Sequence, residues 1–366
     1  MRSNHRIEVA LALAALLGST ACSSQSSQAI PQPATVANHR GSPSGSSGSL
    51  TMWLASPTGG GFHFNGIVEA FGLGGGTPTQ IPSDTIEQGQ PYINFNPAGL
   101  TSPYYLALDP SGNMWIADTF TNFILAFSTT SSPPKMIPTT ALVLPDKAQP
   151  EQIAFDKNGN LWVGQVQYRP PNMQFVSAYS VSSGTPTLIN GSGITTWTTP
   201  EGGSQPFYGV DVAFDPAGHL WAETLDQNTG RQVLAEFNVS NPSAPQQIPS
   251  ASIVLPQATF GSFAFDASGN LWISLIVPVT GGSCGGPNLV SEYSTTNGSL
   301  LTSFSTIQDC AFAMAIDPSG NLWVDGSSTP NGSAPFIFTE YALPSGKLLQ
   351  NVTAIDYDVS SIVFQQ

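Results

Sequence analysis

Short apolar runs separated by tight turns repeat along most of this chain. Between residues 263 and 273 an apolar run ends at Asp266, the turn Ala-Ser-Gly follows, and a second apolar run carries Trp272. This pattern predicts a β-hairpin, because Asp accepts backbone N–H bonds across a turn and Gly adopts the positive φ that other residues resist. Equivalent hairpins are predicted at residues 106–116, 153–163, 212–222 and 314–324, so the chain contains an internal repeat.

A sixth copy of the hairpin is split between the two ends of the repeat region. Residues 50–54 match the second strand, with Trp53 in the Trp position, and residues 361–364 match the first strand. A ring closed by its own termini explains both halves at once. We therefore predict an all-β fold, a six-bladed β-propeller whose N- and C-terminal strands pair.

Each repeat continues with a strand that ends in an aromatic residue, such as Glu292-Tyr293, and then with a shorter, more variable strand. Four antiparallel strands per repeat are typical of a propeller blade. One Trp recurs per blade at one register, which indicates packing between blades rather than a sugar-binding series. Trp197 breaks this register, because it lies in a long insertion at residues 193–208.

The N-terminal region has the features of an export signal. Residues 1–21 combine Arg2 and Arg6 with a short apolar core, and Cys22 follows a small-residue run that resembles the lipobox of bacterial lipoproteins. The alternative is ordinary signal-peptidase cleavage with an incidental Cys. Residues 22–49 are rich in Ser, Gln and Pro, which predicts a flexible tether, and the folded domain is expected at residues 50–366. We expect a lipid-anchored protein of the cell envelope, periplasmic or on the cell surface.

The composition narrows the classes of partner. Charged residues make up only 9% of the chain and the formal net charge is −14. An acidic chain without a Lys/Arg cluster argues against nucleic acid as a partner, and it leaves the lipid anchor as the expected contact with a membrane.

The repeat, with Asp-x-x-Gly-Asn-Leu-Trp at its centre, resembles the NHL-repeat propellers and the related streptogramin lyase-like and gluconolactonase-like families. The resemblance implies either a binding module or an enzyme with its site at the central opening. Streptogramin lyase-like chains use catalytic His and acidic residues there, but His219 occupies a turn position and His63 has no identifiable partner. We therefore expect no catalytic residue and no cofactor.

Gluconolactonase-like propellers hold a divalent metal at the same opening. The residues that enter the inner strands here are Tyr105, Gln152, Asp211, Ser262, Ala313 and Ser361. Asp211 is the one carboxylate among them, with Glu151 and Asp309 in nearby loops. A single carboxylate does not make a cage for a hard cation, so we expect no metal.

Cys284 and Cys310 fall in loops that emerge on the same face of neighbouring blades. An oxidising compartment would join them as a disulfide, and the alternative is two unpaired thiols.

The loops between the second and third strands are long and unlike one another, whereas the Asp turns on the opposite face are short and uniform. Variable loops on a rigid scaffold are where propellers bind ligands. We predict a binding module for a protein, a peptide or a glycan, with a lyase or a lactone hydrolase as the alternative function. The predicted binding residues are Tyr168, Arg169, Trp197, Tyr208, Asp211, Glu223 and Arg231. The aromatic residues among them have a second interpretation, in which they fold the long loops back onto the blades.

Overall fold

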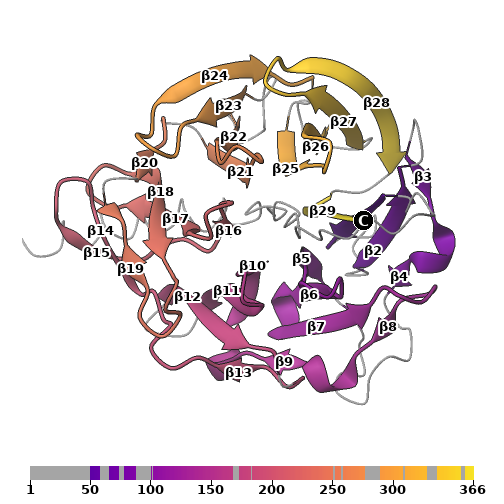
Figure 1. The fold of residues 1–366 in the computed structure, drawn as a ribbon, viewed down its shortest axis with the longest axis horizontal. Helices are drawn as coiled ribbons and strands as arrows, with labels where there is room; N and C mark the ends of the chain where they lie inside the picture. Colours follow the sequence, from indigo (N-terminus) through magenta and orange to yellow (C-terminus); the bar gives the residue numbers. More distant parts are fainter. Residues whose placement is uncertain are drawn as a thin grey trace, which may run out of the picture.

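A computed structural model shows a ring of six β-sheets around a central axis (Figure 1). It describes residues 50–57, 66–73, 78–87, 100, 102–167, 173–182, 184–249, 252–256, 259–276, 289–307, 310–327, 336–355 and 359–366. Each of these sheets has four antiparallel strands, which follow in sequence order from the centre outward except that the C-terminal strand is innermost in blade 1, and three sheets carry a fifth strand. The predicted six-bladed propeller is confirmed.

The strands divide among the blades as follows. Blade 1 consists of β29 (Ser361–Gln365), β1 (Thr51–Ser56), β2 (Ile67–Gly72), β3 (Thr79–Gln80) and β4 (Ile86–Glu87), and blade 2 of β5 (Pro103–Leu108), β6 (Met114–Asp118), β7 (Phe123–Ser128), β8 (Lys135–Met136) and β9 (Leu142–Val143). Blade 3 consists of β10 (Gln149–Phe155), β11 (Asn160–Gln167), β12 (Met173–Ser180) and β13 (Thr187–Leu188).

Blade 4 consists of β16 (Val212–Phe214), β17 (Leu220–Asp226), β18 (Arg231–Asn238), β19 (Gln246–Gln247) and β20 (Ile253–Val254). Blade 5 consists of β21 (Thr259–Phe265), β22 (Leu271–Ile276), β23 (Leu289–Tyr293) and β24 (Leu300–Ser305), and blade 6 of β25 (Cys310–Ile316), β26 (Asn321–Ser327), β27 (Phe336–Ala342) and β28 (Lys347–Ile355).

The remaining regular elements are short. A separate hairpin of β14 (Thr196–Thr198) and β15 (Ser204–Pro206) lies between blades 3 and 4, inside the long insertion of the third repeat, and extends to the outer edge of the ring in Figure 1. Among the described residues, the 3₁₀ turns η1 (Pro82–Asp84), η2 (Thr119–Thr121), η3 (Pro138–Thr140) and η4 (Pro145–Lys147) lie in blades 1 and 2 or lead into blade 3. In the part of the chain that the structure describes there is no helix of the length and apolarity needed to cross a membrane.

The two ends of the ring meet in blade 1. Strand β29 pairs with β1 so that Phe364 lies opposite Met52 and Ile362 opposite Leu54, as the split repeat predicts. Gln365 stands where the other hairpins have Asp, and its Oε1 accepts the Trp53 Nε1–H at 2.9 Å. The terminal strands therefore complete the sixth hairpin, and β1 has a paired strand on both sides.

The Asp of each hairpin explains the repeated sequence. In blade 2 the Asp109 carboxylate accepts the backbone N–H groups of Ser111 and Asn113 at 2.8 and 2.9 Å. It also accepts Asn113 Nδ2 and, at 3.1 Å, Trp115 Nε1. One side chain thus closes the turn and orients the Trp, which is why Asp, Asn and Trp recur at fixed spacing.

The core lies between the blades. The indole of each of four repeat Trp residues packs against the Phe that precedes the Asp position of the next blade. These pairs, with ring centroids 5.6–6.3 Å apart, are Trp115–Phe155, Trp162–Phe214, Trp221–Phe265 and Trp323–Phe364. Such aromatic contacts contribute about 0.5–1.5 kcal/mol each beyond the area they bury.

Candidate functional site

The blades give the ring two different faces. Every inner strand runs toward its Asp turn, so all the Asp turns lie on one side, which we call the turn face. The inner strands begin on the opposite side, which we call the loop face. Asp211 directly precedes β16 and Glu151 lies near the start of β10, so both carboxylates lie toward the loop face in neighbouring blades.

Three buried carboxylates come together near the start of these inner strands. Asp211 is only 2% exposed, and burial raises its pKa well above the ordinary value. The negative charges of Glu223 and, to a smaller extent, Glu151 raise it further. No described residue donates a hydrogen bond to Asp211 Oδ1. A buried oxygen without a donor is costly to maintain, so Asp211 has an oxygen that can accept a further hydrogen bond.

Glu223 is the second member of the cluster and comes from β17. Its backbone N–H donates to the Asp211 carbonyl at 2.9 Å, which fixes the two residues side by side. Burial raises the Glu223 pKa from 4.5 to about 8, and a hydrogen bond with Gln232 opposes part of that rise. The link before β16 passes so close that a Cβ on Gly209 would lie 1.6 Å from the Glu223 carbonyl oxygen. The site is therefore tightly packed on that side.

The β14–β15 hairpin is fastened to blade 4 beside this cluster. Gln205 Nε2 donates to Asp226 Oδ1 at 2.8 Å, and Gln247 exchanges two hydrogen bonds with the backbone of Thr198. A hydrogen bond from Thr229, together with those of Gln205 and the local backbone, lowers the Asp226 pKa. The insertion is thus held to blade 4 by side-chain hydrogen bonds on both of its strands.

The structure places the other predicted binding residues differently. Tyr208 is half-buried next to the cluster, where its N–H donates to Thr224 Oγ1 at 3.1 Å. Trp197 was expected on the surface but is 2% exposed and packs with Phe207 and Phe237 between blades 3 and 4. This placement matches the alternative interpretation, in which the aromatic packs locally. Arg231 is exposed and lines a separate cavity of about 620 Å³ between blades 4 and 5.

Several predicted positions lie outside the described residues. These are Tyr168, Arg169, Cys22, Cys284, His63 and Asp309, and for Cys310 the side chain alone lies outside them. Their predicted roles in binding, lipidation and disulfide formation stay predictions. Glu151, which was expected in a loop, lies in β10 instead, because the first strand of blade 3 begins earlier than the repeat alone indicates.

The carboxylates do not complete the metal cage that a gluconolactonase-like resemblance implies. Apart from Asp211, the described residues that enter the inner strands are uncharged: Tyr105, Gln152, Ser262, Ala313 and Ser361. One of these serines, Ser361, already accepts the Leu106 N–H through its hydroxyl at 3.1 Å. A hard cation needs six to eight oxygen ligands around it, and here the carboxylates approach from two adjacent blades. The arrangement fits an organic cation or a hydrogen-bond donor better than a metal ion.

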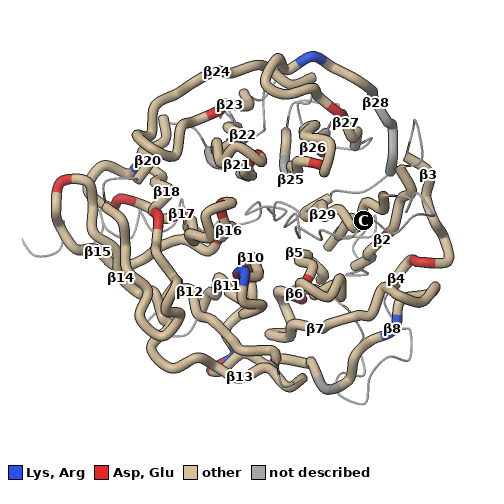
Figure 2. Tube along the Cα trace, in the orientation of Figure 1, with Lys and Arg blue, Asp and Glu red and all other residues tan. Residues whose placement is uncertain are grey.

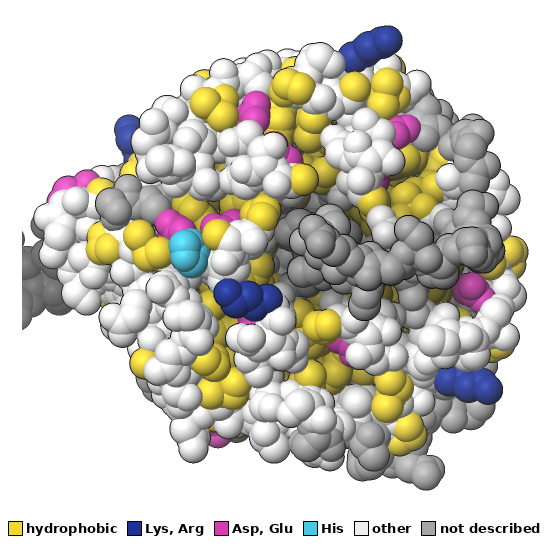
Figure 3. All heavy atoms as spheres, in the orientation of Figure 1, with side chains coloured by type: hydrophobic (Ala, Val, Ile, Leu, Met, Phe, Trp, Pro, Cys, Tyr) yellow, Lys and Arg dark blue, Asp and Glu magenta, His cyan; other side chains and the backbone are white. Residues whose placement is uncertain are grey.

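The charge distribution makes this cluster stand out. Figure 2 shows acidic positions on inner strands of several blades, whereas Lys and Arg are few and dispersed. Figure 3 shows that most side chains on the viewed face are uncharged. The charges of Glu223 and Glu151 both act on the buried Asp211 carboxyl, so these three residues form a local group rather than part of a general acidic surface.

The comparisons with known proteins support the fold. Neither a family model nor a curated protein matches the sequence. The chain is similar to the structure of a putative 6-phosphogluconolactonase from Bacteroides fragilis, with 13% identity, a TM-score of 0.53, and 89% of this chain and 100% of that chain covered.

Two further structures extend the comparison. A protein of unknown function from Bacteroides caccae has 10% identity and a TM-score of 0.52 over 86% of this chain and 98% of that chain. A virginiamycin B lyase from Staphylococcus aureus has 12% identity and a TM-score of 0.42, with 82% and 84% covered. At 10–13% identity, the similarity to the two Bacteroides structures shows the propeller fold and nothing about activity.

Proposed function

We propose that this chain is an exported, lipid-anchored, NHL-like propeller that binds a peptide or a partner protein through a basic group. The observation that carries the proposal is Asp211, which is buried, has an oxygen without a hydrogen-bond donor, and lies beside Glu151 and Glu223. An ammonium or guanidinium group supplies both the missing donor and the opposite charge.

Electrostatics explains why such a ligand would be favoured. In the free protein, burial keeps Asp211 and Glu223 protonated to unusually high pH, and the negative charges of Glu223 and Glu151 act in the same direction on Asp211. A cation placed among them stabilises the ionised forms, and the attraction is strong because little water screens it. Binding should therefore release protons, and the affinity should rise as the pH increases toward the Glu223 pKa of about 8.

The export and anchoring parts of the proposal rest on the sequence. Residues 1–21 have the pattern of a signal peptide, Cys22 follows a small-residue run, and residues 22–49 have the composition of a tether. Such a tether would let the propeller reach a partner some distance from the membrane. Labelling with a radioactive fatty acid should modify the wild-type chain but not a Cys22→Ser variant, and equal labelling would contradict the anchor.

Binding can be tested with a peptide array in which Lys, Arg, Glu or Gln occupies one position of an Ala/Gly background. The wild-type protein should retain the Lys and Arg peptides preferentially. Asp211→Asn should weaken that retention about 10- to 100-fold, because a charge-assisted hydrogen bond is lost. Glu201→Gln, which removes an exposed carboxylate from the β14–β15 hairpin, is the matched control and should change nothing. Equal retention of acidic peptides, or unchanged retention by Asp211→Asn, would contradict the proposal.

A second candidate function, a lyase or a lactone hydrolase, is favoured by one observation. A carboxylic acid with a pKa of about 8 stays protonated at neutral pH, so Glu223 could donate a proton to a leaving group. The two functions differ in their response to Glu223→Gln. Turnover of a lactone or a cyclic depsipeptide would be abolished in this variant, whereas binding of a basic peptide would persist because Asp211 still supplies a carboxylate.

A further inference from the structure

The Asp turn of blade 4 differs chemically from the others. Blades 2, 3, 5 and 6 have Asn at the residue that follows the turn Gly, and blade 4 has His219. In blade 5 the Asn270 amide lies between two carboxylates, with Nδ2 donating to Glu292 Oε1 at 2.9 Å and to Asp266 Oδ2 at 3.3 Å. His219 therefore places an imidazole where the repeat already provides two carboxylates.

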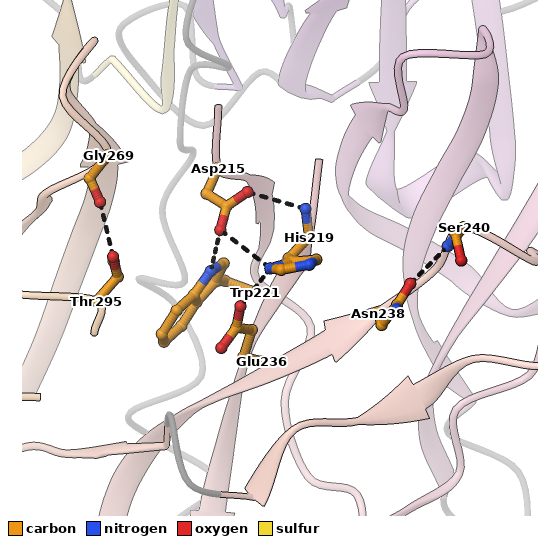
Figure 4. A network of polar contacts seen from close by, with 8 residues as sticks. All are labelled: Asp215, His219, Trp221, Glu236, Asn238, Ser240, Gly269 and Thr295. Atoms are coloured by element: carbon orange, nitrogen blue, oxygen red, sulfur yellow. Dashed lines mark hydrogen bonds and ion pairs between the residues drawn. The ribbon is translucent and has the colours of Figure 1, made fainter. Parts of the chain in front are cut away.

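In blade 4 the side chains of Asp215, His219 and Glu236 converge. His219 Nδ1 lies 2.5 Å from Glu236 Oε1 and 3.6 Å from Asp215 Oδ2, and the three atoms all lie within 4.8 Å of one another (Figure 4). Both carboxylates are at least nine-tenths buried, whereas the imidazole is about one-third exposed. Asp215 directly follows the inner strand β16, Glu236 belongs to β18, and the turn holds His219 between them.

This set of atoms matches what a four-coordinate transition metal requires. Zn²⁺ binds imidazole nitrogen and carboxylate oxygen at about 2.0–2.2 Å, which sets neighbouring ligand atoms roughly 3.4 Å apart. The Asp215–His219 separation already has that length. The His219–Glu236 contact would lengthen by about 1 Å as the metal replaces the shared proton. Ca²⁺ and Mg²⁺ are disfavoured, because they take oxygen ligands in larger number.

The surroundings suit a divalent ion as well. Two carboxylates balance its charge, and Trp221 Nε1 donates to Asp215 Oδ2 at 3.1 Å, which orients that oxygen as an outer hydrogen bond does in metal sites. The exposed edge of His219 borders a cavity of about 150 Å³ on the turn face, which Lys157 and Ser240 also line. Water from this cavity can supply the fourth ligand.

We propose that Asp215, His219 and Glu236 form a Zn²⁺-binding site on the turn face of blade 4. The site is independent of the carboxylates on the loop face, and it departs from the expectation of a protein without a metal. Imidazole with two carboxylates also accepts Co²⁺, which provides a spectroscopic probe.

The repeat offers two variants that test the proposal. His219→Asn restores the residue found in the other turns, so the variant should fold. It should bind one Zn²⁺ fewer than the wild-type chain in isothermal titration calorimetry, or bind it with an affinity reduced on the order of 100-fold or more. Asn270→His transfers the imidazole to the matching position of blade 5, beside Asp266 and Glu292, and should add one equivalent.

Co²⁺ loading provides the second readout. The wild-type chain should show the visible absorption of four-coordinate Co²⁺, and His219→Asn should lose it. Zn²⁺ binding of equal stoichiometry and affinity in wild type and His219→Asn would overturn the proposal, since the ion would then bind elsewhere. Failure of the wild-type chain to bind Zn²⁺ at micromolar concentration would overturn it too.

Discussion

Replacing Glu223 by Gln should change how the stability of the protein depends on pH. In the unfolded chain this carboxyl ionises near 4.5, whereas in the folded protein it stays protonated until about pH 8. Between these values the folded state binds more protons than the unfolded state, so the free energy of unfolding falls as the pH rises. The stabilisation that protonated Glu223 gives the folded state is fully present below pH 4.5 and is lost as the pH rises through 8.

The size of this change in unfolding free energy follows from the difference between the two Glu223 pKa values. Each pH unit between the two pKa values corresponds to about 1.4 kcal/mol, so wild type loses about 3 kcal/mol by pH 7 and up to about 5 kcal/mol by pH 9. Gln has nearly the same shape and no charge at any of these pH values. Glu223→Gln should therefore match wild type within about 1 kcal/mol at pH 4 and exceed it by several kcal/mol at pH 9.

Urea unfolding at pH 4, 7 and 9 measures these differences directly, provided that the m-values of the two proteins agree. Glu201→Gln serves as the control, because Glu201 is exposed and its removal should shift stability equally at each pH. Parallel pH profiles for Glu223→Gln and wild type would refute the reasoning. They would mean that Glu223 is ionised and solvated in the folded protein.

The remaining predictions concern the ring itself. Deleting residues 359–366 removes three apolar side chains from the closing strand, which should lower the free energy of unfolding by about 5–9 kcal/mol and abolish cooperative thermal unfolding. An unchanged thermal unfolding curve would contradict the closure of the ring by its termini. Gly164→Ala places a Cβ 1.9 Å from the Val210 carbonyl oxygen and should destabilise the protein by about 1–3 kcal/mol. In the control Gly193→Ala the new Cβ meets nothing within 4 Å, so the stability should not change. A denaturant titration of both variants can check the difference. Thiol titration of the exported, unfolded and unreduced chain should find at most one free cysteine, and two or more would exclude the predicted disulfide.

The sequence was sufficient to predict the ring because each blade repeats the same local chemistry. An Asp that binds the turn amides and the Trp indole fixes the spacing of the hairpin, so the pattern is visible without any tertiary information. The two halves of the sixth hairpin carry the same pattern, so the pairing of the terminal strands could be predicted as well. The sequence did not indicate that Gln365 would take the place of Asp, because no repeat contains Gln there.

The candidate site was harder to predict because it depends on contacts between blades. Asp211 could be named from its position before an inner strand, but its raised pKa depends on its burial between blades and on the charges of Glu223 and of Glu151 in the preceding blade. The predicted surface position of Trp197 was wrong because the repeated pattern does not extend to this residue. It lies outside the repeat, so no register indicated that the β14–β15 hairpin would turn its indole inward against Phe207.

Proton release on ligand binding tests the central claim most directly. The basic peptide retained best on the array should be titrated into the full chain at pH 7 by calorimetry, in two buffers with different ionisation enthalpies. If Asp211 and Glu223 are protonated when free and ionised when they hold a cation, the observed heats will differ between the buffers in the sense of net proton release, and Asp211→Asn will reduce the difference. Equal heats in the two buffers, or net proton uptake, would contradict the account.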